Sequence, residues 1–190
     1  SGGIRLDIKD QQGLIEGYNA LHADIAMHDP AANVESVLVQ EMASKGKEVM
    51  IGGKRDPVFG PAITFGEGGN QVEANSDIAV ALPPLNSYLV ADMIRSTHIS
   101  TRLGEFRNMP AVNMNALELV LLRISEMVCE LPWITAMEIN PLIVDEDGVV
   151  AVDASITVDN VSPTADRYDH MAIHPYPSHL ISTWTVPDGT

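Results

Sequence analysis

Residues 136–156 read AMEINPLIVDEDGVVAVDASI. Two apolar runs rich in Ile and Val flank the tetrapeptide Asp145–Gly148, and runs of this composition are typical of β-strands. The Asp-Gly step that closes the tetrapeptide favours a tight turn. The segment therefore predicts an antiparallel hairpin with strands at Ala136–Val144 and Val149–Ile156.

The sequence before this hairpin contains two helical patterns. Apolar residues recur at three- and four-residue spacing in Leu85–Thr97 and again in Asn115–Leu131, and the polar segment Ser100–Met109 between them reads as a surface connection. Four short strands are expected further upstream, at Ser36–Met42, Glu48–Gly52, Ala62–Phe65 and Asp77–Leu82. The polar turn Ser44–Lys47 predicts that the first two of these strands form a hairpin.

At the N-terminal end, Ile4–Ile8 reads as a strand, and a helical pattern follows from Leu14 to Ile25. This helix is expected to end near Asp29–Pro30, because proline disfavours helix at the residue before it. The order of elements lacks strict alternation of strand and helix. We therefore expect an α+β fold with a mixed or antiparallel sheet and helices packed on one side.

The composition is that of a globular chain with a large excess of acid. The 190 residues include 26 Asp and Glu against 11 Lys and Arg, which gives a net charge of −15, and 45% of them are hydrophobic. Such acidity disfavours nucleic acids and anionic membrane surfaces, because basic side chains hold both. No segment has the form of a membrane span or a signal peptide, so we expect a cytoplasmic protein. The single cysteine, Cys129, lies in the second helical pattern and is expected to be a buried apolar side chain.

Three polar side chains interrupt the apolar hairpin, namely Glu138, Asn140 and Asp153. Strand alternation puts Glu138 and Asn140 on one face, and Asp153 can reach that face from the partner strand. Two carboxylates and an amide oxygen suit a hard divalent cation such as Mg²⁺. The alternative is a hydrogen-bonded anchor for the turn, because an unpaired buried carboxylate is costly. The residues alone leave both interpretations open.

Two turns rich in glycine are further candidates. The Gly66–Gly69 loop could offer N–H groups to an anion, but it lacks the spacing of a P-loop or a dinucleotide motif, and a tight structural turn is the favoured interpretation. Segment Gly52–Pro61 carries Lys54, Arg55 and Asp56, which suit either a phosphate site or a solvated turn with a local Arg–Asp pair. The six histidines lack the spacings of common zinc sites.

Five motifs in a fixed order resemble those of one family. They are Val37–Met42, Glu48–Pro61, Phe65–Gly69, Glu138–Leu142 and Val152–Ala154. Together they resemble the ATP-grasp domain of NDP-forming acyl-CoA synthetases and, more loosely, the β subunits of succinyl-CoA synthetases. The resemblance covers residues 1–158 and implies an ATP-grasp fold that binds ATP.

The resemblance implies a role for each of the three polar hairpin residues. Asn140 and Asp153 match the positions that hold the Mg²⁺ ion of the nucleotide. Glu138 matches the carboxylate that positions the phosphorylated histidine of a partner domain during phosphoryl transfer, and it is the expected catalytic residue. A carboxylate suits that role because it stabilises an imidazolium.

Four other positions are expected to contact the nucleotide. Glu48 matches an acid that accepts hydrogen bonds from the ribose hydroxyls. Gln40 occupies the hinge position that faces adenine, where succinyl-CoA synthetases have Glu. Lys54 and Arg55 lie in a turn typical of the family and are expected to contact phosphates.

Two features of the family are missing from this chain. The phosphate-binding Lys and Gly that precede the position of Ser1 in the family are absent, and the catalytic histidine that relays phosphate belongs to another domain. We therefore expect residues 1–158 to form the larger, C-terminal part of an ATP-grasp domain, without its N-terminal piece and with weak or undetectable ATP turnover alone. The expected partners are CoA-binding and catalytic-histidine domains of the same or another chain.

Residues 159–190 have a different character, because they combine Pro and His with no apolar periodicity. The run Tyr168–Pro177 and the ending Asp188–Thr190 resemble the junction before the acetyltransferase (GNAT) domain of bacterial protein lysine acetyltransferases. This implies a tail or linker toward such a domain. Two functions are then expected: acyl-CoA formation from ATP through a phosphohistidine, or a degenerate module that senses acyl-CoA or nucleotide and regulates an attached acetyltransferase.

Overall fold

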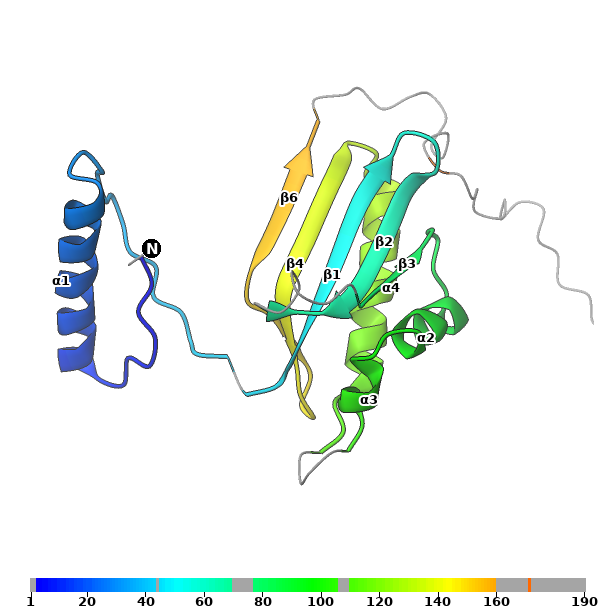
Figure 1. The fold of residues 1–190 in the computed structure, drawn as a ribbon, viewed down its shortest axis with the longest axis horizontal. Helices are drawn as coiled ribbons and strands as arrows, with labels where there is room; N and C mark the ends of the chain where they lie inside the picture. Colours follow the sequence, from blue (N-terminus) through cyan, green and yellow to red (C-terminus); the bar gives the residue numbers. More distant parts are fainter. Residues whose placement is uncertain (1–2, 44, 70–76, 106–109, 160–170, 172–190) are drawn as a thin grey trace, which may run out of the picture. The chain divides into compact units, whose positions relative to one another are not determined.

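The computed structural model describes residues 3–43, 45–69, 77–105, 110–159 and 171. The chain divides into two units, residues 1–43 and residues 44–190 (Figure 1). Each unit is described on its own below. Within the ranges that the structure describes, none of the helices combines the length and the hydropathy of a membrane span.

The N-terminal unit is built around one helix, α1 (Gln11–His28). Asp10 caps the helix by accepting a hydrogen bond from the Gly13 N–H at 2.8 Å. The helix ends at the residue before Asp29, as the proline that follows predicts. The expected end of this helix is therefore confirmed.

Two predicted strands of this unit are wrong. Both Ile4–Ile8 and Ser36–Met42 are irregular segments. A strand needs a hydrogen-bonded neighbour, and the described part of this unit contains no other strand to pair with. The first segment contacts α1 instead, because Arg5 forms an ion pair with Asp24 of that helix.

The second unit contains a six-stranded sheet. Its strands are β1 (Lys47–Asp56), β2 (Gly60–Glu67), β3 (Ile78–Ala81), β4 (Ile134–Val144), β5 (Val149–Ala151) and β6 (Ala154–Val158). They lie in the order β3-β2-β1-β4-β5, β6 also pairs with β4, and each pairing among the described strands is antiparallel. The expected α+β class is confirmed, and the sheet is antiparallel rather than mixed.

Strand β1 has other partners than the predicted one. It is paired with β2 on one side and with β4 on the other, where Gly52 lies opposite Glu138. Because both of its edges are occupied, β1 has no edge left for a strand at Ser36–Met42. The predicted hairpin through the turn Ser44–Lys47 is therefore wrong.

The Gly- and Pro-rich segment forms the turn between β1 and β2. Asp56 lies opposite Gly60, and its Oδ1 accepts hydrogen bonds from the N–H groups of Phe59 at 2.9 Å and Val58 at 2.7 Å. These two bonds lower the pKa of Asp56. Gly60 has a φ of +70°, and a short hairpin loop that ends in a left-handed residue favours glycine there.

The second predicted hairpin forms, but its second strand is divided. Strands β4 and β5 meet at the predicted turn, with Val144 opposite Val149. In the middle of β4, Pro141 has no N–H to donate, and its carbonyl accepts from the Val152 N–H at 3.1 Å. The predicted strand Val149–Ile156 breaks at this point, and β6 pairs with the first half of β4.

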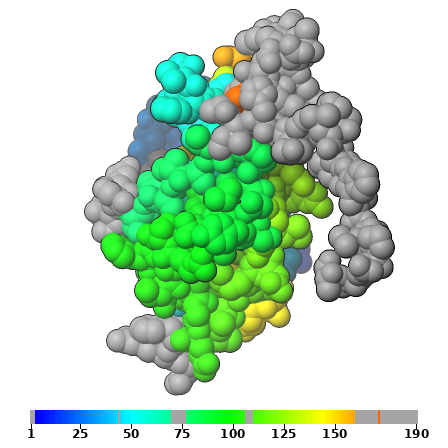
Figure 2. Space-filling view, turned by 90° about the vertical axis from the view of Figure 1, so that its right-hand side faces the viewer, coloured from blue at the N-terminus to red at the C-terminus, as the bar shows by residue number. Residues whose placement is uncertain are grey.

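Three helices cover one face of the sheet (Figure 1). They are α2 (Ser87–Arg95), α3 (Ser100–Leu103) and α4 (Met114–Glu130). Asn86 and Asn113 cap the two longer helices by accepting backbone N–H groups at 2.9 Å and 3.0 Å. Figure 2 looks onto this side of the unit, where α2 and α3 form the surface in front of the sheet. Helices α2 and α4 confirm the two predicted helical patterns.

The core lies between the sheet and these helices. The fully buried residues of β1 and β2 alternate along the strands and are Val49, Ile51, Ile63 and Phe65. They belong to one cluster with Val90 and Met93 of α2 and Leu117, Leu121 and Ile124 of α4. Leu103 of α3 is also 1% exposed within this core, so the predicted surface connection Ser100–Met109 is wrong in its first part. Residues 106–109 lie outside the described ones.

The opposite face of the sheet carries polar side chains of β1 and β4 together with apolar ones of β3, such as the exposed Val80. The side chains of β1 that alternate with the core residues include Glu48 and Lys54, and both are exposed. Residues opposite each other on paired strands share a face, so Glu138 of β4 lies on this side with its partner Gly52. We call this side of the second unit the open face.

Replacing Phe65 by alanine is expected to destabilise the second unit by about 3–5 kcal/mol, because the change leaves a cavity between sheet and helices. Phe59 is 57% exposed in the β1–β2 turn, so Phe59→Ala is the matched control and is expected to change stability by about 0.5 kcal/mol or less. Urea unfolding followed by circular dichroism measures both variants. Equal losses of stability would contradict this location of the core.

Candidate functional site

Four polar side chains line a pocket of about 180 Å³ beside β4 and β6. They are Glu138, Asn140, Asp153 and Ser155. The strand pairing brings them together, because Glu138 lies opposite Ser155 and the Asn140 N–H donates to the Asp153 carbonyl at 3.1 Å. The structure thus gathers the three polar residues that the sequence singles out, and it adds Ser155, which the sequence analysis missed.

The Asn140 side chain is held by two hydrogen bonds. Its Oδ1 accepts from the Gly69 N–H at 2.8 Å, and its Nδ2 donates to Glu138 Oε1 at 3.2 Å. These bonds fix which end of the amide carries the oxygen, because only Oδ1 can accept from a backbone N–H. One lone pair of Oδ1 remains for a further ligand.

The glycine loop packs directly against β1. The Gly68 N–H donates to the Glu48 carbonyl at 3.0 Å, and a Cβ on Gly68 would lie 2.5 Å from backbone atoms of Val49. Gly69 has a φ of +75°, and a Cβ there would lie 2.0 Å from Glu48 Oε2. Both N–H groups are used inside the protein, which favours the interpretation of this loop as a tight structural turn.

Glu48 and Lys54 lie on the same face of β1 as Gly52, whose partner is Glu138. Gly52 is closely packed, since a Cβ there would lie 2.4 Å from Thr64 Oγ1. The Glu48 carboxylate lies beside Gly69, which in turn bonds Asn140. Glu48 therefore adjoins the pocket through Gly69, and Lys54 lies on the same face, two residues beyond Gly52.

Arg55 lies on the other side of β1, toward the helices. Its Nε donates to the Ile134 carbonyl at 3.1 Å, and burial lowers the pKa of its guanidinium. Cys129 of α4 is nearby and 5% exposed, as predicted, and burial raises the pKa of its thiol to about 11. The structure therefore does not bring Arg55 together with Lys54 and Glu138.

The remaining predictions fall elsewhere in the chain. Gln40 belongs to the N-terminal unit, where its side chain is exposed. The predicted tail, residues 159–190, lies outside the described residues except for Asp159 and Met171. No group of three or more His, Cys, Asp and Glu side chains with the geometry of a metal site occurs in the described ranges.

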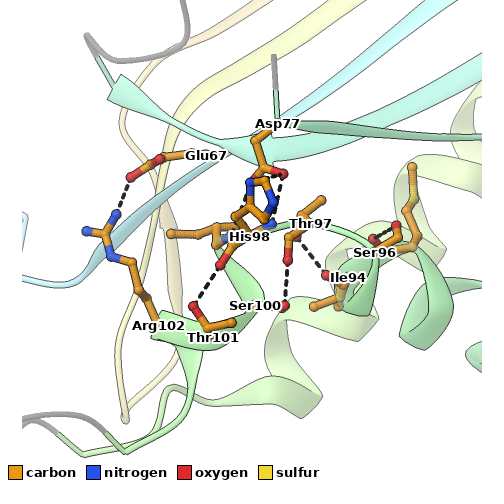
Figure 3. Close-up of polar contacts among 11 residues, drawn as sticks. Glu67, Asp77, Ile94, Ser96, Thr97, His98, Ser100, Thr101 and Arg102 are labelled. Carbon is orange, nitrogen blue, oxygen red and sulfur yellow. Dashed lines mark hydrogen bonds and ion pairs between the residues drawn. The ribbon is translucent and has the colours of Figure 1, made fainter. Parts of the chain in front are cut away.

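A polar cluster missed by the sequence analysis borders the glycine loop (Figure 3). Glu67 at the end of β2 forms an ion pair with Arg102 of α3. Asp77 Oδ1 accepts from the His98 N–H at 2.8 Å and its Oδ2 accepts from the Ile99 N–H at 3.1 Å. The residues are far apart in sequence and carry no recognisable motif, so no sequence signal could have found them.

The pocket has the donors of a site for a hard cation. Its ligating atoms are all oxygens, from two carboxylates, one amide and one hydroxyl. Mg²⁺ typically takes one or two carboxylates and completes its shell with water and substrate phosphates. The free lone pair of Asn140 Oδ1 and the carboxylate of Asp153 fit this pattern.

Gly69→Ala is expected to destabilise the second unit by about 1–2 kcal/mol, because alanine tolerates a positive φ poorly and its Cβ displaces the Glu48 carboxylate. Gly148 offers the control, since a Cβ there would have no atom within 4 Å. Urea unfolding of both variants tests the close packing of the loop. If Gly69→Ala is as stable as Gly148→Ala, the described contact between Gly69 and Glu48 does not exist.

The ATP-grasp domain family matches residues 1–158 of this chain. Among curated proteins, the acetate–CoA ligase [ADP-forming] I subunit beta of Pyrococcus furiosus is 33% identical over 81% of this chain and 66% of its own length. The acetate–CoA ligase [ADP-forming] I of Archaeoglobus fulgidus is 33% identical over 80% of this chain and 22% of its own length. The chain thus spans under two thirds of one relative and about a fifth of the other.

A solved structure has the same fold. It is the dinucleotide forming acetyl-coenzyme A synthetase 1 of Ca. Korarchaeum cryptofilum in complex with coenzyme A and Mg-AMPPCP, with its phosphohistidine segment pointing towards the nucleotide binding site. It matches with a TM-score of 0.73 and 31% identity over 83% of this chain and 68% of that chain. The expected ATP-grasp fold is confirmed. The chain belongs to the ATP-grasp domain family, of the type found in NDP-forming acyl-CoA synthetases.

Proposed function

We propose that this chain forms the Mg-nucleotide-binding part of an NDP-forming acyl-CoA synthetase. The observation that carries the proposal is the convergence of Glu138, Asn140 and Asp153 on one pocket of the open face. Relatives of similar sequence are acyl-CoA ligases, and the related solved structure holds coenzyme A and Mg-AMPPCP. The proposed cofactors are therefore ATP and Mg²⁺, with CoA as a substrate of the whole enzyme.

In this proposal Asn140 and Asp153 hold the Mg²⁺ ion. The ion, when bound, neutralises the charge that develops on the phosphates during transfer. Asn140 presents Oδ1 because its other end is bound to Glu138. Asp153 lies in the break between β5 and β6, opposite Asn140, and its side chain lines the pocket from there.

The nucleotide itself is assigned to the rest of the open face. Lys54 places a positive charge on this face and would contact phosphates, and Glu48 would accept hydrogen bonds from the ribose hydroxyls. Arg55 is already bound to the Ile134 carbonyl, so its role here is to hold β1 to β4 rather than to contact phosphate. For Gln40, the proposal keeps the adenine contact that the resemblance implies.

Glu138 is proposed to act in phosphoryl transfer. In the whole enzyme the bond between the γ-phosphorus of ATP and its bridging oxygen breaks, a bond to a histidine nitrogen of another domain forms, and ADP leaves. The phosphoryl group then passes to a carboxylate substrate, and the CoA thiol displaces phosphate to give acyl-CoA. Glu138 would stabilise the imidazolium and hold it in line, which is positioning and electrostatic catalysis.

Removing either proposed metal ligand is expected to weaken Mg-ATP binding by about tenfold or more. The variants are Asn140→Ala and Asp153→Asn, and the control is Asp147→Asn in the exposed β4–β5 turn, which removes the same charge from the same hairpin. Isothermal titration calorimetry with Mg-ATP, repeated in EDTA, measures the affinity. Unchanged affinity in both variants would contradict the site, and so would absence of Mg-ATP binding to both this chain and a longer form of the protein.

A second function is favoured by one observation. The run Tyr168–Pro177 resembles the junction before a GNAT domain, so the domain could instead sense nucleotide or acyl-CoA for an attached acetyltransferase. Incubating the complete protein with γ-labelled ATP separates the two. Acid-labile label on histidine, lost in Glu138→Gln but kept in Asp147→Asn, is expected for the ligase. If histidine carries no label and the acetyltransferase activity depends on nucleotide, the ligase function is contradicted and the sensor function is supported.

A further inference from the structure

We propose that Arg102 and Asp77 are positioning residues, which hold the glycine loop against β1 and thereby orient the Asn140 amide. Figure 3 shows both residues with their partners Glu67 and His98. The expected effect of Arg102 and Asp77 on Mg-ATP affinity rests on the proposed function. Their effect on the position of the loop does not. Neither residue lines the pocket. Each acts through groups that lie between it and Asn140.

The ion pair between Arg102 and Glu67 joins two elements of the fold. Glu67 is the last residue of β2, and its side chain is 18% exposed, against 52% for that of Arg102. The pairs Arg95–Asp92 and Arg123–Glu126 differ, because each lies within a single helix at i,i+3 spacing. Among these three, only the Arg102–Glu67 pair restrains one element against another.

The α3 side of this ion pair is itself rigid. Ile99 and Leu103, which flank the pair on α3 and its N-terminal end, are 2% and 1% exposed in the core. The Asp77 side chain is 10% exposed and accepts the N–H groups of both His98 and Ile99. A buried carboxylate with two backbone donors is costly to disrupt. Arg102 therefore contacts Glu67 from a helix that is held by the core and by Asp77.

Two residues, Gly68 and Gly69, connect Glu67 to the hydrogen bond with Asn140. At the base of the loop, Gly66 packs on Asp77, since a Cβ on Gly66 would lie 2.4 Å from the Asp77 carbonyl oxygen. After Glu67, the Gly68 N–H bonds to β1 and the Gly69 N–H bonds to Asn140 Oδ1. Loss of the restraint on Glu67 frees Gly69 to move, and Asn140 then loses the donor that sets its amide.

Amide hydrogen exchange of Gly68 and Gly69, followed by NMR on the 190-residue chain without nucleotide, tests the positioning directly. Arg102→Gln is expected to accelerate exchange at both glycines by about two- to fivefold, as expected for loss of a partly exposed ion pair, and to leave amides of α4 unchanged. Arg102→Lys keeps the charge and is expected to restore slow exchange. Arg95→Gln, which breaks a pair within α2, is the control.

The same variants are titrated with Mg-ATP. Arg102→Gln is expected to weaken binding by a similar factor, with Arg102→Lys close to wild type. Exchange at Gly68 and Gly69 equal to that of Arg95→Gln would overturn the proposal, as would faster exchange throughout the unit without rescue by lysine. If neither this chain nor a longer form of the protein binds Mg-ATP, the proposed function fails, but selective exchange at the two glycines still supports the positioning.

Discussion

Strand β1 is hydrogen-bonded along both edges, and the rest of the second unit depends on that pairing. With β2 on one side and β4 on the other, its side chains can point only toward the helices or toward the open face. Val49 and Ile51 take the first direction and are completely buried, whereas Glu48 and Lys54 take the second. The same pairing that builds the core therefore gathers the polar groups of the site on the opposite face.

Close packing of glycine is what brings the loop after β2 into the site. A side chain on Gly68 would overlap the backbone of Val49, and one on Gly69 would overlap the carboxylate of Glu48. Without side chains, both N–H groups reach acceptors, one on β1 and one on Asn140. The bond from Gly69 also orients the half-buried Asn140 amide, because it fixes the position of Oδ1. The loop and the hairpin thus define the site together.

Local patterns in the sequence predict much of this architecture and fail where distant segments meet. Asn115–Leu131 shows strong periodicity and forms α4, and the Asp-Gly step predicts the β4–β5 turn, since both signals act over a few residues. The partners of β1 lie far away in sequence, so the hairpin predicted with Ser36–Met42 was the wrong choice among possible neighbours. The division into β5 and β6 falls opposite Asn140 and Pro141, and an alternating pattern does not reveal it.

For the site, alternation within one hairpin is enough to predict that Glu138 and Asn140 share a face, and the strand pairing adds Asp153. It cannot predict the bond from Gly69 or the contact of Arg102 with Glu67, because these join segments 71 and 35 residues apart. Two residues that are adjacent in sequence can also lie on opposite faces of a strand. Lys54 and Arg55 are neighbours in sequence, yet β-strand geometry sends them to opposite faces, and only Lys54 shares the face of Glu48 and Glu138.

In the proposed function, the open face holds a metal–nucleotide complex at Asn140 and Asp153. Paramagnetic Mn²⁺ in place of Mg²⁺ tests it most directly, because bound Mn-ATP broadens the amide signals of nearby residues in an NMR spectrum. The strongest broadening is expected at Gly69, Asn140 and Asp153, with the signals of α4 on the other face much less affected. Broadening centred on α4, or bound Mn-ATP that leaves Asn140 and Asp153 sharp, would contradict it.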